Sequence, residues 1–60
     1  MKKYVLKVGY FEPRRKCTVR AKDEEEAFMK CRTEMDRRHD KAGTEPPVGY
    51  DMEIVEVSEV

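Results

Sequence analysis

The stretch from Thr18 to Cys31 constrains the fold more than any other part of the chain, because it joins a strand to a helix. Its first residues alternate between apolar and polar side chains, as a strand does. Asp23 is then a good N-cap, and Glu26 stands three residues later, in the capping-box position. The acidic first turn also matches the positive end of the helix dipole. This join predicts a strand followed by a helix, and it carries no reaction chemistry.

Sixty residues limit the chain to one small domain, residues 1–60. A domain of this length buries only about 60% of the surface that its unfolded chain exposes. A deep catalytic cleft is hard to build from so small a core, whereas a surface that docks on something larger is easier. The sequence has no catalytic serine–histidine–acid pattern, zinc-binding helix motif or glycine-rich phosphate loop. It therefore predicts a binding protein that is not an enzyme and needs no cofactor.

Apolar residues at a spacing of two predict three strands, at residues 4–11, 16–21 and 50–57. The loop between the first two is short, with Pro13 suited to a turn over residues 12–15, so these strands should form an antiparallel hairpin. The first strand would place Tyr10 on the same face as Leu6. In the third strand, Ile54 and Val55 break the alternation, which predicts a bulge there or burial on both faces.

The helix should run from about Glu24 to Lys41 and stop at Gly43. Apolar residues at helical spacing predict one buried stripe, made of Ala27, Phe28, Cys31 and Met35. Beyond this stripe the helix offers little to a core, so its last turns should be exposed. Two pairs of opposite charge four residues apart, Glu26–Lys30 and Glu34–Arg38, should stabilise the solvated side.

These elements predict an α+β fold with the order β-β-α-β, in which one helix covers one face of a three-stranded antiparallel sheet. The third strand is expected beside the first, because the first is the most apolar and suits the centre of the sheet. The alternative is a third strand parallel to the second, reached through a right-handed crossover.

The two cysteines, Cys17 and Cys31, occupy apolar positions of their elements. The favoured interpretation is a pair of reduced, buried thiols in a cytoplasmic protein, although a disulfide between them stays open. His39 and scattered carboxylates are too few and too dispersed to predict a metal site. No apolar stretch is long enough to span a membrane.

Thirteen basic and thirteen acidic side chains give the chain a formal net charge of zero. This balance argues against binding nucleic acid mainly through phosphates, which needs a basic excess. The basic clusters at the hairpin and the helix end are either a solvated surface or a contact for RNA or an acidic protein. The candidate partner-binding residues are Arg14, Arg15, Lys16, Arg20, Arg37, Arg38 and Glu56.

Two segments, Ala21-Lys-Asp-Glu-Glu-Glu-Ala27 and Pro47-Val-Gly-Tyr-Asp51, resemble the small inhibitor of bacterial RNA polymerase made by T7-like phages. The resemblance covers about residues 17 to 57, with the same order of elements. It implies a non-catalytic protein that docks on the polymerase jaw through arginines of its last strand. The matching positions in this chain are Ile54 and Glu56.

The chain is also similar to the archaeal ribosomal protein LX family, which binds ribosomal RNA. This likeness covers most of the chain and is carried by Val8-Gly-Tyr-Phe11, Val19-Arg-Ala21, Glu25-Glu-Ala27, Arg38-His39 and Ile54-Val-Glu-Val57.

The leading expectation is therefore a phage-type accessory protein, a monomer or weak dimer, that docks on a host protein such as RNA polymerase and inhibits or modulates it. The alternative is an RNA- or ribosome-associated protein.

Overall fold

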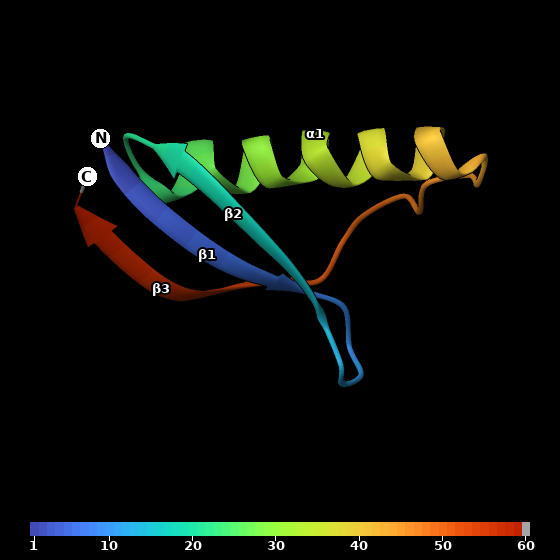
Figure 1. Ribbon diagram of the computed structural model, residues 1–60, viewed down its shortest axis with the longest axis horizontal. Coiled ribbons are helices and arrows are strands. Elements are labelled where there is room, and N and C mark those ends of the chain that lie inside the picture. Colours follow the sequence, from blue (N-terminus) through green and yellow to red (C-terminus); the bar gives the residue numbers. More distant parts are fainter. Residues whose placement is uncertain (60) are drawn as a thin grey trace.

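The computed structural model describes residues 1–59, which form one sheet of three strands with a single helix lying across it (Figure 1). The strands are β1 (Lys2–Val8), β2 (Arg15–Ala21) and β3 (Met52–Glu59), and the helix is α1 (Glu24–Ala42). The sheet has the order β2-β1-β3, and both pairs of neighbours are antiparallel. The predicted α+β fold and its favoured strand order are confirmed.

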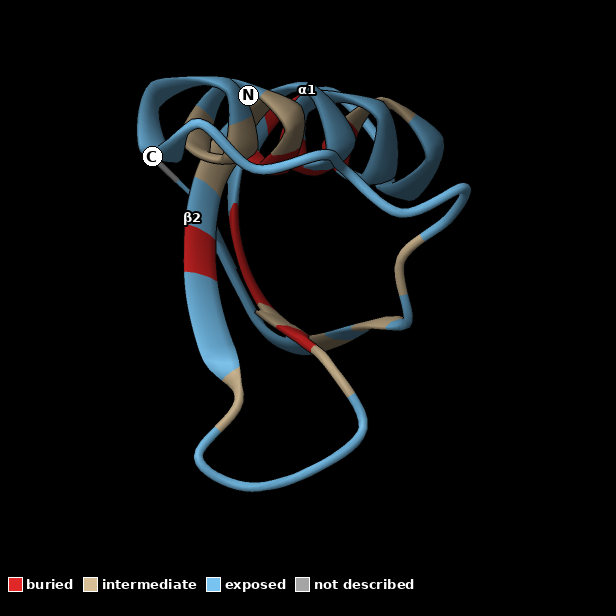
Figure 2. Ribbon diagram, turned by 90° about the vertical axis from the view of Figure 1, so that its right-hand side faces the viewer, coloured by how far each residue is buried: buried red, intermediate tan, exposed pale blue. Residues whose placement is uncertain are grey.

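The core lies between α1 and the β1–β2 half of the sheet, because the helix packs mainly on β2 (Figure 2). Three of the four predicted stripe residues are buried, namely Ala27, Cys31 and Met35. The prediction was wrong for Phe28, which is 37% exposed. This ring lies at the edge of the stripe and lines a shallow hollow with Met52, on the side of the helix that β2 does not cover.

Both ends of α1 have the predicted caps. The backbone N–H of Glu26 donates to Asp23 Oδ1 at 2.8 Å, and Glu26 Oε1 in turn accepts from the backbone N–H of Lys22 at 3.1 Å. At the other end, Gly43 has a φ of 75°, a left-handed conformation that glycine adopts without strain. The N–H of Thr44 then reaches back to the carbonyl of His39 at 2.9 Å. These bonds explain why the helix begins and ends where it does.

The first strand is shorter than the alternation predicts. It ends at Val8 because Gly9 has a φ of 120°, although the Gly9 N–H still donates to the Asp51 carbonyl at 2.8 Å. Tyr10 and Phe11 therefore lie in the hairpin loop, where they are 81% and 87% exposed. The prediction that Tyr10 shares a strand face with the core was wrong.

The predicted irregularity in the third strand is a bulge at Val55. Leu6 lies opposite Ile54, whereas the preceding residue of β1, Val5, lies opposite Glu56. One residue of β3 is thus left without a partner across the ladder. The bulge brings Glu56 to the face of the sheet that points away from α1, and Val57 to the face that points toward it.

The two cysteines meet in the core, where β2 supplies Cys17 and α1 supplies Cys31. Both thiols are free and buried. Burial, together with the hydrogen bond to Cys17, raises the pKa of Cys31 from 9.0 to about 12.

Candidate functional site

The face of the sheet opposite α1 carries a patch of positive charge. Residues that lie opposite each other in the register share a face, so this uncovered face alternates with the core positions Tyr4, Leu6 and Val8. Its β1–β2 half presents four cations, which we call the cationic face: Lys3, Lys7, Lys16 and Arg20. Val5 lies among them and is only 6% exposed, although no helix covers it. Neighbouring side chains on this face therefore shield Val5 from water.

The register places like charges directly opposite one another on this face. Lys7 lies opposite Lys16, and Lys3 lies opposite Arg20. Directly opposed like charges destabilise a sheet, whereas opposite charges in the same positions stabilise it by about 0.2–1 kcal/mol per pair. The ion pairs found within residues 1–59 include none of these four side chains. Within the β1–β2 pair these like charges lower the stability of the free protein, although Glu53 of β3 lies opposite Lys7 on its other side.

The β3 half of the same face is acidic. It carries Glu53 opposite Lys7 and Glu56 opposite Val5. Arg14 reaches across from the hairpin to Glu53, with its Nη1 at 2.9 Å from Oε1, and its Nε lies 3.1 Å from Glu12. The backbone and side-chain hydrogen bonds from Arg14 hold the pKa of Glu12 below its usual value. The uncovered face is thus divided between a positive half and a negative half.

The two arginines near the end of the helix, Arg37 and Arg38, both form ion pairs with Glu34. Glu34 accepts from Arg37 at 2.8 Å and from Arg38 at 3.2 Å, as the predicted Glu34–Arg38 pair requires. These two guanidiniums, Arg37 first, hold the pKa of Glu34 below its usual value. Two helix cations also reach the outer edge of β2, where Lys30 donates to the carbonyl of Arg20 at 2.7 Å and Arg38 to that of Lys16 at 3.5 Å. The helix thereby covers this edge of the sheet.

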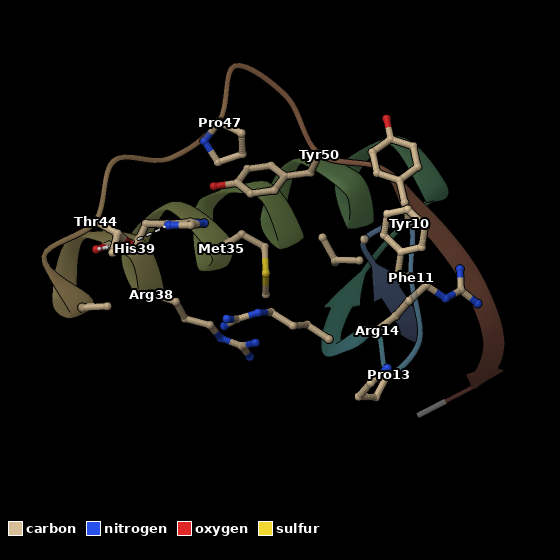
Figure 3. Close-up of a pocket in the computed structure, with 14 residues that line it drawn as sticks. Tyr10, Phe11, Pro13, Arg14, Met35, Arg38, His39, Thr44, Pro47 and Tyr50 are labelled. Atoms are coloured by element: carbon tan, nitrogen blue, oxygen red, sulfur yellow. Dashed lines mark hydrogen bonds between the residues drawn. The ribbon is translucent and has the colours of Figure 1, made fainter.

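A second feature is a groove of about 580 Å³, which we call the hairpin groove. Three segments line it, namely the β1–β2 loop, the second half of α1 and the linker that leads into β3 (Figure 3). Its lining includes Met35 of the helix and the exposed rings of Tyr10 and Phe11. Arg15 and Arg38 also line it. The groove lies at the hairpin end of the molecule and is separate from the cationic face.

The structure divides the predicted contact residues among three places. Lys16, Arg20 and Glu56 share the uncovered sheet face. The hairpin groove contains Arg15 and Arg38, together with part of Arg14, while Arg37 is exposed on the helix. The basic run at residues 14–16 is therefore not one cluster, because neighbouring strand residues point to opposite faces.

Sequence reasoning missed Lys3 and Lys7 as candidate contacts. The signal that could have found them is the hairpin register, which sets them opposite Arg20 and Lys16. Lys7 lies within the predicted strand, whereas Lys3 belongs to it only because β1 starts at Lys2, two residues before the predicted start.

The described part of the chain shows no arrangement for metal binding, since residues 1–59 contain no group of three or more histidine, cysteine or carboxylate side chains placed to share an ion. The single histidine, His39, uses Nδ1 in a hydrogen bond with Thr44 Oγ1 at 2.8 Å. In the same residues, no helix is both long enough and apolar enough to cross a membrane.

No protein-family model, curated protein or solved structure matches this chain significantly.

Proposed function

We propose that this chain is a non-enzymatic binding module of the phage-accessory type, which docks its uncovered sheet face on an acidic surface of a larger host protein and inhibits or modulates it in the cytoplasm. The observation that carries the proposal is the register between β1 and β2, which sets Lys7 opposite Lys16 and Lys3 opposite Arg20. An anionic partner would turn this repulsion into attraction on binding. RNA polymerase is the target implied by the resemblance to phage inhibitors.

The division of charge favours a protein over RNA as the partner. Glu53 and Glu56 lie beside the cationic face on the same sheet, where they would repel a phosphate backbone. A protein surface can offer carboxylates to the β1–β2 half and basic groups to the β3 half. A standard interface takes about 800 Å² per partner, which is about a sixth of the 4660 Å² surface of this chain.

The first test is capture of the partner from bacterial lysate with the tagged chain, with and without ribonuclease. We expect a host protein in stoichiometric amount that survives ribonuclease and that mass spectrometry identifies. Ribosomal proteins or RNA that disappear on ribonuclease treatment would replace the proposal with the RNA-associated alternative.

The second test uses Lys16→Glu on the cationic face and Lys22→Glu, which makes the same charge change just before the helix. We expect Lys16→Glu to weaken the identified complex at least tenfold and Lys22→Glu to leave it within twofold. Equal binding by both variants would refute docking through this face.

Salt dependence separates the two partner classes. Contacts with four phosphates of a single strand would give a slope of log affinity against log salt of about −3, and a protein interface a shallower one.

A further inference from the structure

We infer that the hairpin groove is a peptide-binding site, which takes an acidic segment of the partner and buries one aromatic side chain of it between the hairpin loop and the helix. This inference rests on the proposed function, because the segment is taken to belong to the protein on which the chain docks. It assigns a second contact, on the opposite side of the hairpin from the cationic face.

The ionisable side chains that line the groove are mainly basic, and none is a carboxylate. The chain has as many acidic as basic residues, yet the groove is lined by three arginines and a histidine and by no aspartate or glutamate. Its volume of about 580 Å³ lies in the range of sites that hold small ligands or single side chains. A groove with this charge is complementary to an anion.

Most polar groups around the groove already have partners. The Tyr50 hydroxyl donates to Asp36 at 2.6 Å, His39 is bonded to Thr44, and Arg14 is held by Glu12 and Glu53. Arg38 is shared between Glu34 and the carbonyl of Lys16. Arg15, by contrast, makes no side-chain hydrogen bond or ion pair to any residue in the range 1–59.

Arg15 therefore supplies the free guanidinium of the groove, and a carboxylate is a group that it can bind through two parallel hydrogen bonds. The nearby charge of Arg38 adds to the attraction. This requirement selects a ligand with at least one carboxylate next to the part that enters the groove.

The apolar part of the groove selects an aromatic anchor. Met35 lies in the lining with its side chain almost fully buried, and Tyr10 and Phe11 stand at the hairpin side as large exposed rings (Figure 3). A methionine sulfur and aromatic rings both make favourable contacts with an inserted ring. Such a ring would also remove Tyr10 and Phe11 from water, at about 25 cal/mol for each Å² of apolar surface covered.

The test is a titration of the ¹⁵N-labelled full chain with three short blocked peptides, followed by amide chemical shifts. The probe is Glu-Glu-Phe-Glu-Glu, and its matched controls replace the phenylalanine by alanine or all four glutamates by lysine. We expect shifts at the hairpin loop and the second half of α1, with the probe binding at least tenfold more tightly than either control. Equal affinity for a control, or shifts on the cationic face instead, would overturn the inference. Tighter binding of a pentauridylate than of the probe would overturn it in favour of base stacking.

Variants keep the test independent of folding. Arg15→Glu and Phe11→Ser change exposed side chains, so the spectrum should stay that of the folded chain. We expect Arg15→Glu to lower the affinity for the probe at least tenfold and Phe11→Ser to lower it at least fivefold. Lys16→Glu, one residue away on the opposite face, should leave this affinity within twofold. Unchanged binding by both groove variants would refute the site. If the peptide binds the groove but no host protein is captured, the proposed function is refuted and the peptide site stands. If a host protein is captured but the peptide does not bind, only the peptide site is refuted.

Discussion

The hydroxyl of Tyr50 donates a hydrogen bond to Asp36 Oδ1 at 2.6 Å and so ties the linker before β3 to the exposed half of the helix. Burial first, and then this bond, raises the pKa of Tyr50 to about 12. We expect Tyr50→Phe to lower the midpoint of thermal unfolding by about 4–8 °C, the shift that loss of one ordinary hydrogen bond produces in a domain of this size. Tyr10→Phe, in the exposed loop, is the control and should have no effect.

The same bond predicts a pH dependence. The phenol of Tyr50 has a higher pKa in the folded chain than its ordinary 10.0, so its contribution to stability is complete below pH 10 and is lost as the pH rises toward 12. An NMR titration of the ring should give a midpoint near 12 in the native chain and a lower one in Asp36→Asn. A Tyr50 midpoint that Asp36→Asn leaves unchanged would show that the carboxylate does not contribute.

Lys16→Glu should stabilise the fold. The carboxylate that it introduces would lie opposite Lys7 and turn a repulsive pair into an attractive one, which is worth about 0.2–1 kcal/mol. Urea unfolding at low salt should show a higher midpoint, and high salt should remove the gain because it screens surface charges. A loss of stability in this variant would contradict the register between β1 and β2. If Lys16→Glu is more stable, its weaker binding to the partner cannot result from damage to the fold.

Gly9→Ala should destabilise the chain by about 1–3 kcal/mol, because its φ of 120° is strained for any residue with a Cβ atom. Gly49→Ala is the matched control, since Gly49 has no positive φ and a Cβ atom there would meet no atom within 4 Å. The control should be neutral or gain up to about 1 kcal/mol from a less flexible unfolded chain. Both values follow from urea unfolding.

Asp23→Ala should cost about 1 kcal/mol through loss of the helix cap, and Asp23→Asn should restore most of it because an amide oxygen also accepts the Glu26 N–H. Circular dichroism during thermal unfolding measures both variants. Equal losses in the two would indicate that charge, rather than the cap hydrogen bond, stabilises this end of the helix.

The two thiols should be unreactive in the native chain. Burial holds the pKa of Cys31 at about 12, so the reactive thiolate is scarce at pH 8, and both sulfurs are shielded from reagents. Reaction with Ellman's reagent should be at least a hundredfold slower than in guanidinium chloride. The raised pKa also means that Cys31 stabilises the fold fully below pH 9 and progressively less toward pH 12. Fast native labelling would show that the core opens around α1.

Local signals in the sequence predicted much of this fold. The cap at Asp23, the stop at Gly43 and the bulge next to Ile54 each depend on a few neighbouring residues, and all three are present. Phe28 could not be placed, because its exposure depends on how far the helix lies toward β2 on the sheet. The cationic face depends on cross-strand register, which pairs Lys7 with a residue nine positions later. Gly9 predicted a local disturbance without showing that the strand ends there.

The helix is longer than the strands on which it packs. Its nineteen residues extend about 28 Å, against about 23 Å for a seven-residue strand, and no residue after Met35 in the helix is buried. The last turns therefore project past the strands (Figure 1). With the hairpin loop, they line the groove. Asp36 and Arg38 of this overhang bond to Tyr50 and to the carbonyl of Lys16, but its remaining exposed residues pack on nothing in the core. On the inferred binding by the groove, substitutions at the other exposed positions there should change ligand preference with little loss of folding stability, and a library randomised at those positions should yield mostly folded variants.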